Sequence, residues 1–354
     1  MASACSHGGI YSVDHRLVRV DCSSSVNPLG APKKAITVIK NGASSLAPLY
    51  PDPECRDLKK SLARHLETDI SRITVGNGAV EIIHWFAQAF AKRRVVIPAP
   101  TFCEYELASQ RAGAHVMFVP LAPDFSLGAS TVIDAAKGAD AVFLCNPNNP
   151  TGLLATGEIK KIIKNADSST RILLDECFIE LADGTTDTLV KMAPDHDNLV
   201  VLRSLTKSHG LAGLRLGYSV SSPEVTEKLS AFRVPWNVNG LAQAAGVAAI
   251  SDRAHLTKTV RFVKKEKTFL YNKIKKMRSF APLASDANYF LVKLNGRNST
   301  EFRDALLIKS GVLVRDCSTF TGMGSQHVRI AVKTHRENLI LQKALERMDD
   351  GKAS

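Results

Sequence analysis

Lys207 is the residue in this chain with the clearest potential for covalent chemistry. It stands between two hydroxyl residues in a loop rich in glycine and small side chains, directly after an apolar run at 199–202 that predicts a buried strand. A lysine amine attacks a carbonyl only when it is unprotonated and held in place, and burial or a nearby cation lowers its pKa toward that state. Arg203 and Arg215 are close to it in sequence. Taken alone, the segment favours such a role only slightly over a solvated surface lysine.

Two more polar motifs follow predicted strands upstream of this lysine. An asparagine-rich turn at 146–152 comes directly after the apolar run at 141–144, and Asp175 comes directly after the run at 172–174. The lysine follows the acid by 32 residues (207 − 175), which leaves room for a helix and a strand between them. Open α/β sheets bind ligands at the carboxyl ends of their strands. The sequence therefore predicts one site that gathers the turn, the acid and the lysine.

A resemblance to a known superfamily rests on these motifs: 149–152, Asp175 with Glu176, and 204–215. They resemble the motifs of fold-type-I pyridoxal-phosphate (PLP) enzymes of the aminotransferase superfamily, and the resemblance covers nearly the whole chain. It implies an α/β fold with a large domain, whose mostly parallel sheet is flanked by helices, and a small α+β domain. It also implies PLP as the cofactor, an electron sink that the protein orients.

The alternation of strands and helices along the middle of the chain also favours a mostly parallel sheet. We expect an arm and the start of the small domain at 1–43, the large PLP-binding domain at 44–251 and the small domain at 252–354. The expected strands are 95–97, 115–119, 171–174, 199–203, 214–219, 289–292 and 328–332. The expected helices are 55–67, 80–91, 156–165, 299–310 and 334–348, with a long basic helix starting near residue 254.

The resemblance assigns the residues around the cofactor. Lys207 is implied as the lysine that binds PLP and acts as acid and base, and Asp175 as the partner of the pyridine nitrogen. Asn149 is implied to contact the phenolic oxygen of the ring, and Phe102 to stack on its face. The residues implied to hold the cofactor phosphate are Gly78, Ala79, Ser204 and Arg215, together with Tyr50, which resembles a tyrosine that reaches the site of a second subunit. The alternative for Tyr50 is a packed loop aromatic.

Three positions depart from the usual pattern of the superfamily. Phe178 replaces a tyrosine whose hydroxyl assists the phenolic oxygen, and Cys177 replaces a common alanine. Val80 stands where a hydroxyl or acidic residue is frequent, so we expect only its backbone to serve the phosphate.

The implied substrate residues lie near the two ends of the chain. Arg329 matches the arginine that binds the substrate α-carboxylate, and Arg315 is a second candidate cation, with a salt bridge to Asp316 as its alternative. A substrate that carries both a carboxylate and a phosphate needs two such anchors. The other candidates are His7, Gly8, Asn27 and Asn149, and for His7 the alternative is a residue of a disordered tail.

Within the superfamily the chain is more similar to L-threonine-O-3-phosphate decarboxylases of cobalamin synthesis than to histidinol-phosphate aminotransferases. The most discriminating segments are His7-Gly8-Gly9 and Arg315-Asp316-Cys317-Ser318. This similarity implies decarboxylation of a small phosphorylated amino acid to (R)-1-amino-2-propanol O-2-phosphate. Two alternatives stay open: a histidinol-phosphate aminotransferase, and a PLP-fold protein that binds without catalysis.

Composition limits the other classes of partner. The chain has 354 residues, 45% of them hydrophobic, and a formal net charge of +12. The basic residues are spread along the chain and are densest at 261–278, where apolar side chains at helical spacing predict a helix with one core face and one solvated face. We therefore expect a field that attracts phosphorylated substrates and no nucleic-acid site.

Cysteine usage and hydropathy bear on the compartment. The seven cysteines are scattered and have no paired metal spacing, which predicts free thiols in a reducing compartment and no metal site. No run approaches the roughly 20 apolar residues that a membrane span requires. We expect a cytoplasmic protein, and the resemblance implies a homodimer with shared active sites.

Overall fold

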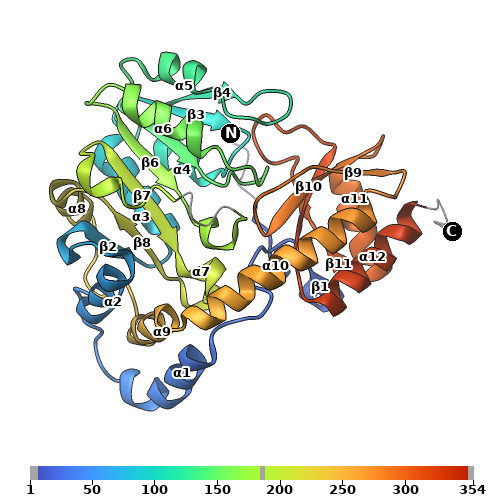
Figure 1. Ribbon diagram of the computed structural model, residues 1–354, viewed down its shortest axis with the longest axis horizontal. Helices are drawn as coiled ribbons and strands as arrows, with labels where there is room; N and C mark the ends of the chain where they lie inside the picture. The colour runs from blue at the N-terminus through green and yellow to red at the C-terminus, as the bar shows by residue number, and fades with distance from the viewer. Residues whose placement is uncertain (1–6, 184–187, 350–354) are drawn as a thin grey trace.

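A computed structural model of the protein describes residues 7–183 and 188–349. Figure 1 shows a large lobe built on one twisted sheet and a smaller lobe at the carboxyl end, with the long helix α10 (Arg253–Ile274) running between them. The first described residues and the strand β1 (Val20–Asp21) belong to a segment that reaches the small lobe.

The large lobe contains a seven-stranded sheet in the order β2-β8-β7-β6-β5-β3-β4. All its strands run parallel except β8, which is antiparallel to both of its neighbours, so the predicted mostly parallel sheet is confirmed. The strands are β2 (Ile73–Gly76), β3 (Arg94–Ala99), β4 (His115–Pro120), β5 (Ala141–Cys145), β6 (Arg171–Asp175), β7 (Leu199–Ser204) and β8 (Gly217–Val220).

Helices cover both faces of this sheet because successive side chains of a buried strand point to opposite faces. On β7, Leu199 and Val201 pack on one face with α2, α5, α6 and α9, whereas Val200 and Leu202 pack on the other with α3, α4 and α8. The helices of this lobe are α1 (Lys33–Leu46), α2 (Arg56–Leu66), α3 (Ala79–Phe90), α4 (Glu104–Arg111), α5 (Ala129–Ala136), α6 (Thr156–Asn165), α7 (Leu205–Ser208), α8 (Pro223–Ser230) and α9 (Gly240–Ile250).

The small lobe has its own apolar core around an antiparallel sheet in the order β12-β13-β10-β9. Beside it, β1 pairs in parallel with β11, which ties the start of the described chain to this lobe. The remaining strands are β9 (Phe280–Pro282), β10 (Tyr289–Leu294), β11 (Val312–Leu313), β12 (Arg315–Asp316) and β13 (His327–Ala331). Helix α12 (His335–Asp349) packs against both α10 and α11 (Ser299–Ser310).

Predicted and observed elements agree where the apolar pattern is strong and differ where a turn intervenes. The helices expected at 156–165 and 299–310 have those bounds. The strand expected from 214 begins only at Gly217, because Arg215 has φ 56 and ends a 3₁₀ turn. Helix α1 was not predicted: it packs against α9, and Ala35 is its one fully buried residue.

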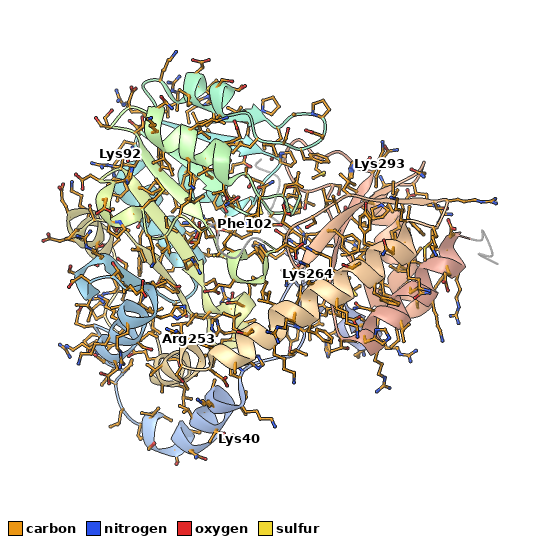
Figure 2. The ribbon with its side chains drawn as sticks, in the orientation of Figure 1. Lys40, Lys92, Phe102, Arg253, Lys264 and Lys293 are labelled. Atoms are coloured by element: carbon orange, nitrogen blue, oxygen red, sulfur yellow. The ribbon has the colours of Figure 1, made fainter. Side chains whose placement is uncertain are left out.

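Helix α10 corrects one detail of the expected solvated basic face. Arg253 and Lys264, both labelled in Figure 2, are exposed on this helix. Lys267, however, is buried, and its Nζ donates to Asp183 Oδ2 at 2.7 Å and to the backbone oxygen of Ser285 at 2.7 Å. This lysine therefore joins α10 to the ends of two loops, a tertiary role that helical periodicity does not reveal.

The cysteines require a second correction. Among the described residues, Cys22, Cys55, Cys145, Cys177 and Cys317 are free, but Cys103 is disulfide-bonded, so the prediction of free thiols is wrong at that position. A disulfide requires two Cα atoms within about 7 Å, a proximity that spacing along the chain does not encode. Of the helices described, none combines the length and the apolar character needed to cross a lipid bilayer.

Candidate active site

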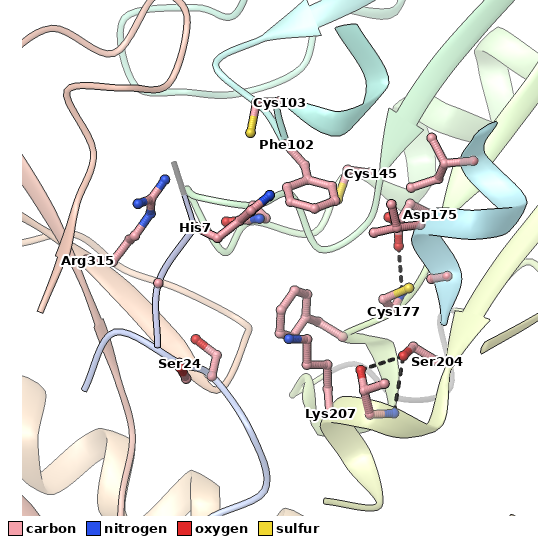
Figure 3. Close-up of a pocket in the computed structure, with 18 of the residues that line it drawn as sticks. His7, Ser24, Phe102, Cys103, Cys145, Asp175, Cys177, Ser204, Lys207 and Arg315 are labelled. Carbon is pink, nitrogen blue, oxygen red and sulfur yellow. Dashed lines mark hydrogen bonds between the residues drawn. The ribbon is translucent and has the colours of Figure 1, made fainter. Parts of the chain in front are cut away.

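A cavity of about 300 Å³ lies where the carboxyl ends of the large sheet face the arm and the small lobe (Figure 3). We divide it into a cofactor half, formed by Ala79, Asp175, Ser204, Lys207 and Arg215, and a substrate half, formed by His7, Gly8, Arg315 and Arg329. Phe102 and Asn149 lie on its wall as well. Of the predicted site residues, the cavity lining leaves out Gly78, Asn27 and Tyr50.

Lys207 is held by the short helix α7 and points into the cavity. Ser204 caps this helix: its Oγ accepts from the backbone N–H of Thr206 at 3.2 Å. Asn27 supports the same turn from outside the cavity, since its backbone N–H donates to the Lys207 oxygen at 2.9 Å and its Nδ2 donates to the Ser208 oxygen at 2.8 Å. The arm therefore fixes the loop that carries the lysine. Asn27 supports this loop from outside the cavity.

The amine of Lys207 is poised to react as a base. Burial lowers its pKa to about 8, and the positive charges of Arg329 and Arg215 add to the effect. Arg203, one of the two cations near it in sequence, is turned away and ion-paired with Glu176 at 3.2 Å and Glu180 at 2.9 Å. Arg329, which is 122 residues further along the chain (329 − 207), is a cation near Lys207 instead of Arg203.

Asp175 ends β6 at the floor of the cofactor half. Its Oδ2 accepts from the Tyr105 hydroxyl at 2.7 Å, and its Oδ1 accepts from the backbone N–H of Cys177 at 2.8 Å. Burial raises the pKa of this carboxyl, while the two hydrogen bonds and Lys207 oppose the shift. A buried carboxylate of this kind is stabilised by a cationic N–H placed against it, as a protonated pyridine nitrogen would be.

The opposite end of the cofactor half is built to receive a phosphate. Helix α3 begins at Ala79, which lines the cavity, and Gly78 caps it with φ 88. A Cβ on Gly78 would lie 2.8 Å from Nη2 of Arg215, and one on Gly217 would lie 2.4 Å from the Ala79 nitrogen. Both glycines therefore permit the close approach of a helix N-terminus and a guanidinium, and Ser204 lines the same cavity, which together make a suitable anion site.

Arg329 connects the two halves. Its Nη1 donates to Oδ1 of Asn149, its Nη2 donates to the Ser23 oxygen at 2.9 Å, and its guanidinium lies 4.9 Å from the centre of the Tyr289 ring. Its buried Nε has no hydrogen-bond partner within the structure. An unsatisfied buried donor is costly, so this nitrogen favours an anionic ligand in the cavity.

Arg315 points into the cavity from β12 (Figure 3). Its Nη2 donates to Thr319 at 3.1 Å, and its guanidinium lies 5.1 Å from the centre of the Phe320 ring. Asp316, the alternative partner considered for it, accepts hydrogen bonds from Ser299, Thr300 and Ser318 instead. Burial and the charge of Arg329 lower the pKa of Arg315 to about 10, so both arginines gain from an anion between them.

The arm supplies the last wall. His7 lines the cavity, and its Nε2 lies 2.9 Å from Oε1 of Glu104. A Cβ on Gly8 would lie 2.8 Å from the Ser23 oxygen, so this glycine lets the arm pack tightly. Tyr50 is different: it is 83% exposed, outside the cavity, with its ring 4.9 Å from that of Trp236.

These features fit PLP. The cavity offers a carboxylate for the ring nitrogen, an anion site for the phosphate and an amine of lowered pKa for the aldehyde, with Phe102 on the wall between them. The ring centre of Phe178 lies 5.7 Å from Nζ of Lys207, and this side chain has no hydroxyl to offer a bound cofactor.

Comparison with known proteins identifies the family. The sequence pattern of aminotransferase class I and II matches residues 20–347, so the chain belongs to that family, and its cofactor is PLP. It is 36% identical over 345 residues to a protein of Caldanaerobacter subterraneus provisionally named threonine-phosphate decarboxylase (96% of this chain, 92% of the relative). It is 34% identical over 336 residues to histidinol-phosphate aminotransferase of Symbiobacterium thermophilum (94% of this chain, 90% of the relative).

Solved structures show the same two groups. L-Threonine-O-3-phosphate decarboxylase of Porphyromonas gingivalis has a TM-score of 0.83 at 28% identity, over 93% of this chain and 99% of that one. Histidinol-phosphate aminotransferase of Sinorhizobium meliloti, solved with pyridoxal-5'-phosphate, has a TM-score of 0.89 at 23% identity, over 98% of this chain and 95% of that one. The protein is thus a PLP-dependent enzyme with the fold-type-I aminotransferase fold.

Sequence reasoning missed the residues that act through others. Ser23 holds Arg329, Tyr105 holds Asp175, and Glu104 holds His7. A weak signal was present only for Glu104 and Tyr105, which follow Phe102 directly after a predicted strand. Ser23 lies in an irregular segment and gave none.

Proposed function

We propose that this enzyme decarboxylates L-threonine O-3-phosphate to (R)-1-amino-2-propanol O-2-phosphate, the reaction that serves cobalamin synthesis in the decarboxylase group. One observation carries the proposal: the substrate half presents two buried arginines, Arg329 and Arg315, with His7 beside them. L-Threonine O-3-phosphate offers one anion to each arginine, a carboxylate and a phosphate. Histidinol phosphate has a phosphate but no carboxylate.

The residues divide the work by position. Arg329, with its unpartnered Nε, binds the carboxylate, and Arg315 with His7 binds the phosphate. The bond between the carboxylate carbon and Cα breaks, and the carboxylate leaves as CO2. PLP, held by Asp175, Lys207, Ser204 and Arg215, would supply the electron sink for the pair of that bond. Lys207 Nζ then delivers a proton to Cα, and Asp175 keeps a negative charge at the ring nitrogen.

Amino transfer would break the Cα–H bond where decarboxylation would break the bond from Cα to the carboxylate, and the choice would depend on how the residues around the site orient the substrate. Nη1 and Nη2 of Arg329 bond to Asn149 and Ser23 and so fix the guanidinium whose Nε would bind the carboxylate, and small shifts of these contacts would decide which bond breaks. The second candidate function is therefore histidinol-phosphate aminotransferase, which the 34% identity to that enzyme favours.

Product analysis tests the proposal. The PLP-loaded enzyme is incubated with L-threonine O-3-phosphate, and separately with histidinol phosphate and 2-oxoglutarate. CO2 with a phosphorylated amino alcohol in the first tube, and no glutamate in the second, is the expected result. Glutamate without CO2 would reject the decarboxylase and favour the aminotransferase. No product in either tube would reject both substrates.

We also propose a homodimer in which Tyr50 reaches the cofactor phosphate of the second subunit. Tyr50 and Trp236 are both exposed, 83% and 49%, and their rings contact each other beside exposed Leu49 and Val234. Equilibrium sedimentation should give twice the chain mass of 38.4 kDa. A monomer that holds PLP with full affinity would reject this assignment.

A further inference from the structure

Tyr105 is a fully buried tyrosine of helix α4 that lies at the cofactor half of the cavity. Its hydroxyl donates to Oδ2 of Asp175 at 2.7 Å. The other oxygen of the same carboxylate, Oδ1, accepts from the backbone N–H of Cys177 at 2.8 Å, the hydrogen bond drawn beside Asp175 in Figure 3. Each oxygen of this carboxylate is therefore held by a donor from a different part of the large lobe.

The ring of Tyr105 is packed so that its hydroxyl has a fixed position. It stacks on Phe143 of β5, with ring centres 5.3 Å apart and planes at 16°. Phe102 packs edge-on against it, with ring centres 5.6 Å apart and planes at 86°. The backbone is held too, since the Ser109 hydroxyl donates to the Tyr105 carbonyl oxygen at 2.7 Å. Close packing of this kind leaves a buried ring little freedom to turn away from its partner.

The two groups of this hydrogen bond are matched in protonation. Burial and the charge of Asp175 raise the pKa of Tyr105 well above its ordinary value, so the hydroxyl keeps its proton and remains a donor. Burial also raises the pKa of Asp175, and hydrogen bonds from Cys177 and Tyr105 oppose that shift. The hydroxyl thus supports the charged form of the acid as well as its orientation.

Orientation matters because Asp175 has further hydrogen bonds to offer. A carboxylate has about four lone-pair sites, and the two donors within the protein occupy two of them. With both oxygens held, the remaining sites point in fixed directions. A ligand N–H gains most from an acceptor that is already oriented, because little side-chain freedom is then lost on binding. The ligand group assigned to Asp175 is the ring nitrogen of PLP.

We propose that Tyr105 is a positioning residue for the cofactor: its hydroxyl fixes the Asp175 carboxylate in the orientation that receives the ring N–H of PLP. The site thereby selects a cofactor with a protonated ring nitrogen. The inference does not depend on which substrate the enzyme uses, and it rests only on the pairing of Asp175 with the ring nitrogen. Because Tyr105 acts through Asp175, its effect belongs to cofactor binding.

Binding of a matched cofactor pair to the full chain, freed of cofactor, tests this inference. The pair is PLP and deaza-PLP, an analogue in which a C–H group replaces the ring nitrogen. Dissociation constants are measured by absorbance titration in the wild type and in Tyr105→Phe, which removes only the hydroxyl. The wild type should prefer PLP. In Tyr105→Phe this preference should fall about tenfold, the order of one hydrogen bond to a charged group, through weaker binding of PLP.

Controls separate positioning from folding. Tyr218→Phe removes the hydroxyl of another buried tyrosine, one that does not line the cavity, and should leave the preference unchanged. Asp175→Asn removes the charge and should abolish most of the preference. Adding Tyr105→Phe to Asp175→Asn should then change the preference no further, and a further fall would contradict an action through Asp175. The thermal unfolding midpoint of each variant shows whether the fold is intact.

The remaining outcomes distinguish two failures. If the wild type binds both compounds equally, Asp175 does not pair with the ring nitrogen, and the assignment on which the inference rests is wrong. If the wild type prefers PLP and folded Tyr105→Phe keeps an equal or greater preference, the inference alone is overturned, because the hydroxyl then only shares the charge of the carboxylate. Equal losses of affinity for both compounds would also overturn it, since they would indicate a change in the shape of the cavity.

Discussion

The cofactor half of the cavity comes from strand and helix ends of a single lobe, whereas the substrate half is assembled from the arm and two strands of the small lobe. Asp175 and Ser204 end neighbouring strands of one sheet, so their separation is fixed by the sheet itself. Arg315 and His7 come from parts of the chain more than 300 residues apart (315 − 7 = 308). The difference indicates that chemistry is fixed in a rigid frame, while the choice of substrate depends on how separate segments meet.

The largest loss of activity should come from Lys207→Ala in the cofactor half. Loss of the amine removes both the attachment of PLP and the acid–base group, so activity should fall by at least about 10³-fold. The absorbance of the cofactor-loaded protein should also change. Lys228→Ala, which removes an exposed lysine paired with Glu224, is the control and should match the wild type.

Arg315→Met should impair the substrate half while sparing the cofactor half. Removing one charged anchor for the substrate phosphate should raise KM by about 10²-fold, with PLP absorbance and PLP affinity unchanged. Steady-state kinetics and a cofactor titration measure the two effects separately. Loss of PLP binding in this variant would mean that the two halves are not independent.

Gly78→Ala should impair the cofactor half and spare the substrate half, and its effect should be smaller than that of Arg315→Met. Its Cβ would lie 2.8 Å from Arg215 Nη2 and would be strained at φ 88, so we expect PLP affinity to fall about tenfold. Gly113→Ala is a matched control, because Gly113 has φ 84 with nothing within 4 Å of an added Cβ. Equal losses of PLP affinity in both variants would mean that contact with Arg215 does not matter.

The smallest effect concerns the pH at which cofactor-free enzyme captures PLP. Only the neutral amine of Lys207 attacks the aldehyde, so the capture rate should rise with pH with a midpoint near 8, the lowered pKa of that lysine. Arg329→Met removes a positive charge that lowers this pKa, so its midpoint should move upward. Stopped-flow absorbance measures both midpoints. A wild-type midpoint near the ordinary lysine value of 10.5 would contradict the electrostatics described for the site.

Sequence reasoning reached the cofactor half more completely than the substrate half, for a physical reason. Lys207, Asp175 and Asn149 each follow an apolar run, and parallel strands bring such positions to one edge of a sheet. Contacts such as Ser23 with Arg329, 306 residues apart, follow from no periodicity and depend on how the lobes pack. The same limit explains why Lys267 was expected in solvent and why Arg203 was considered as a neighbour of Lys207.

Which bond to Cα breaks is the most direct test. L-Threonine O-3-phosphate is prepared with carbon-13 in its carboxylate and deuterium on Cα, and the products of the PLP-loaded enzyme are followed by mass spectrometry and NMR. We predict that carbon-13 leaves as CO2 and that deuterium stays on Cα. Retention of carbon-13 with loss of deuterium, in the presence of an amino acceptor, would contradict decarboxylation and show that the substrate half directs amino transfer.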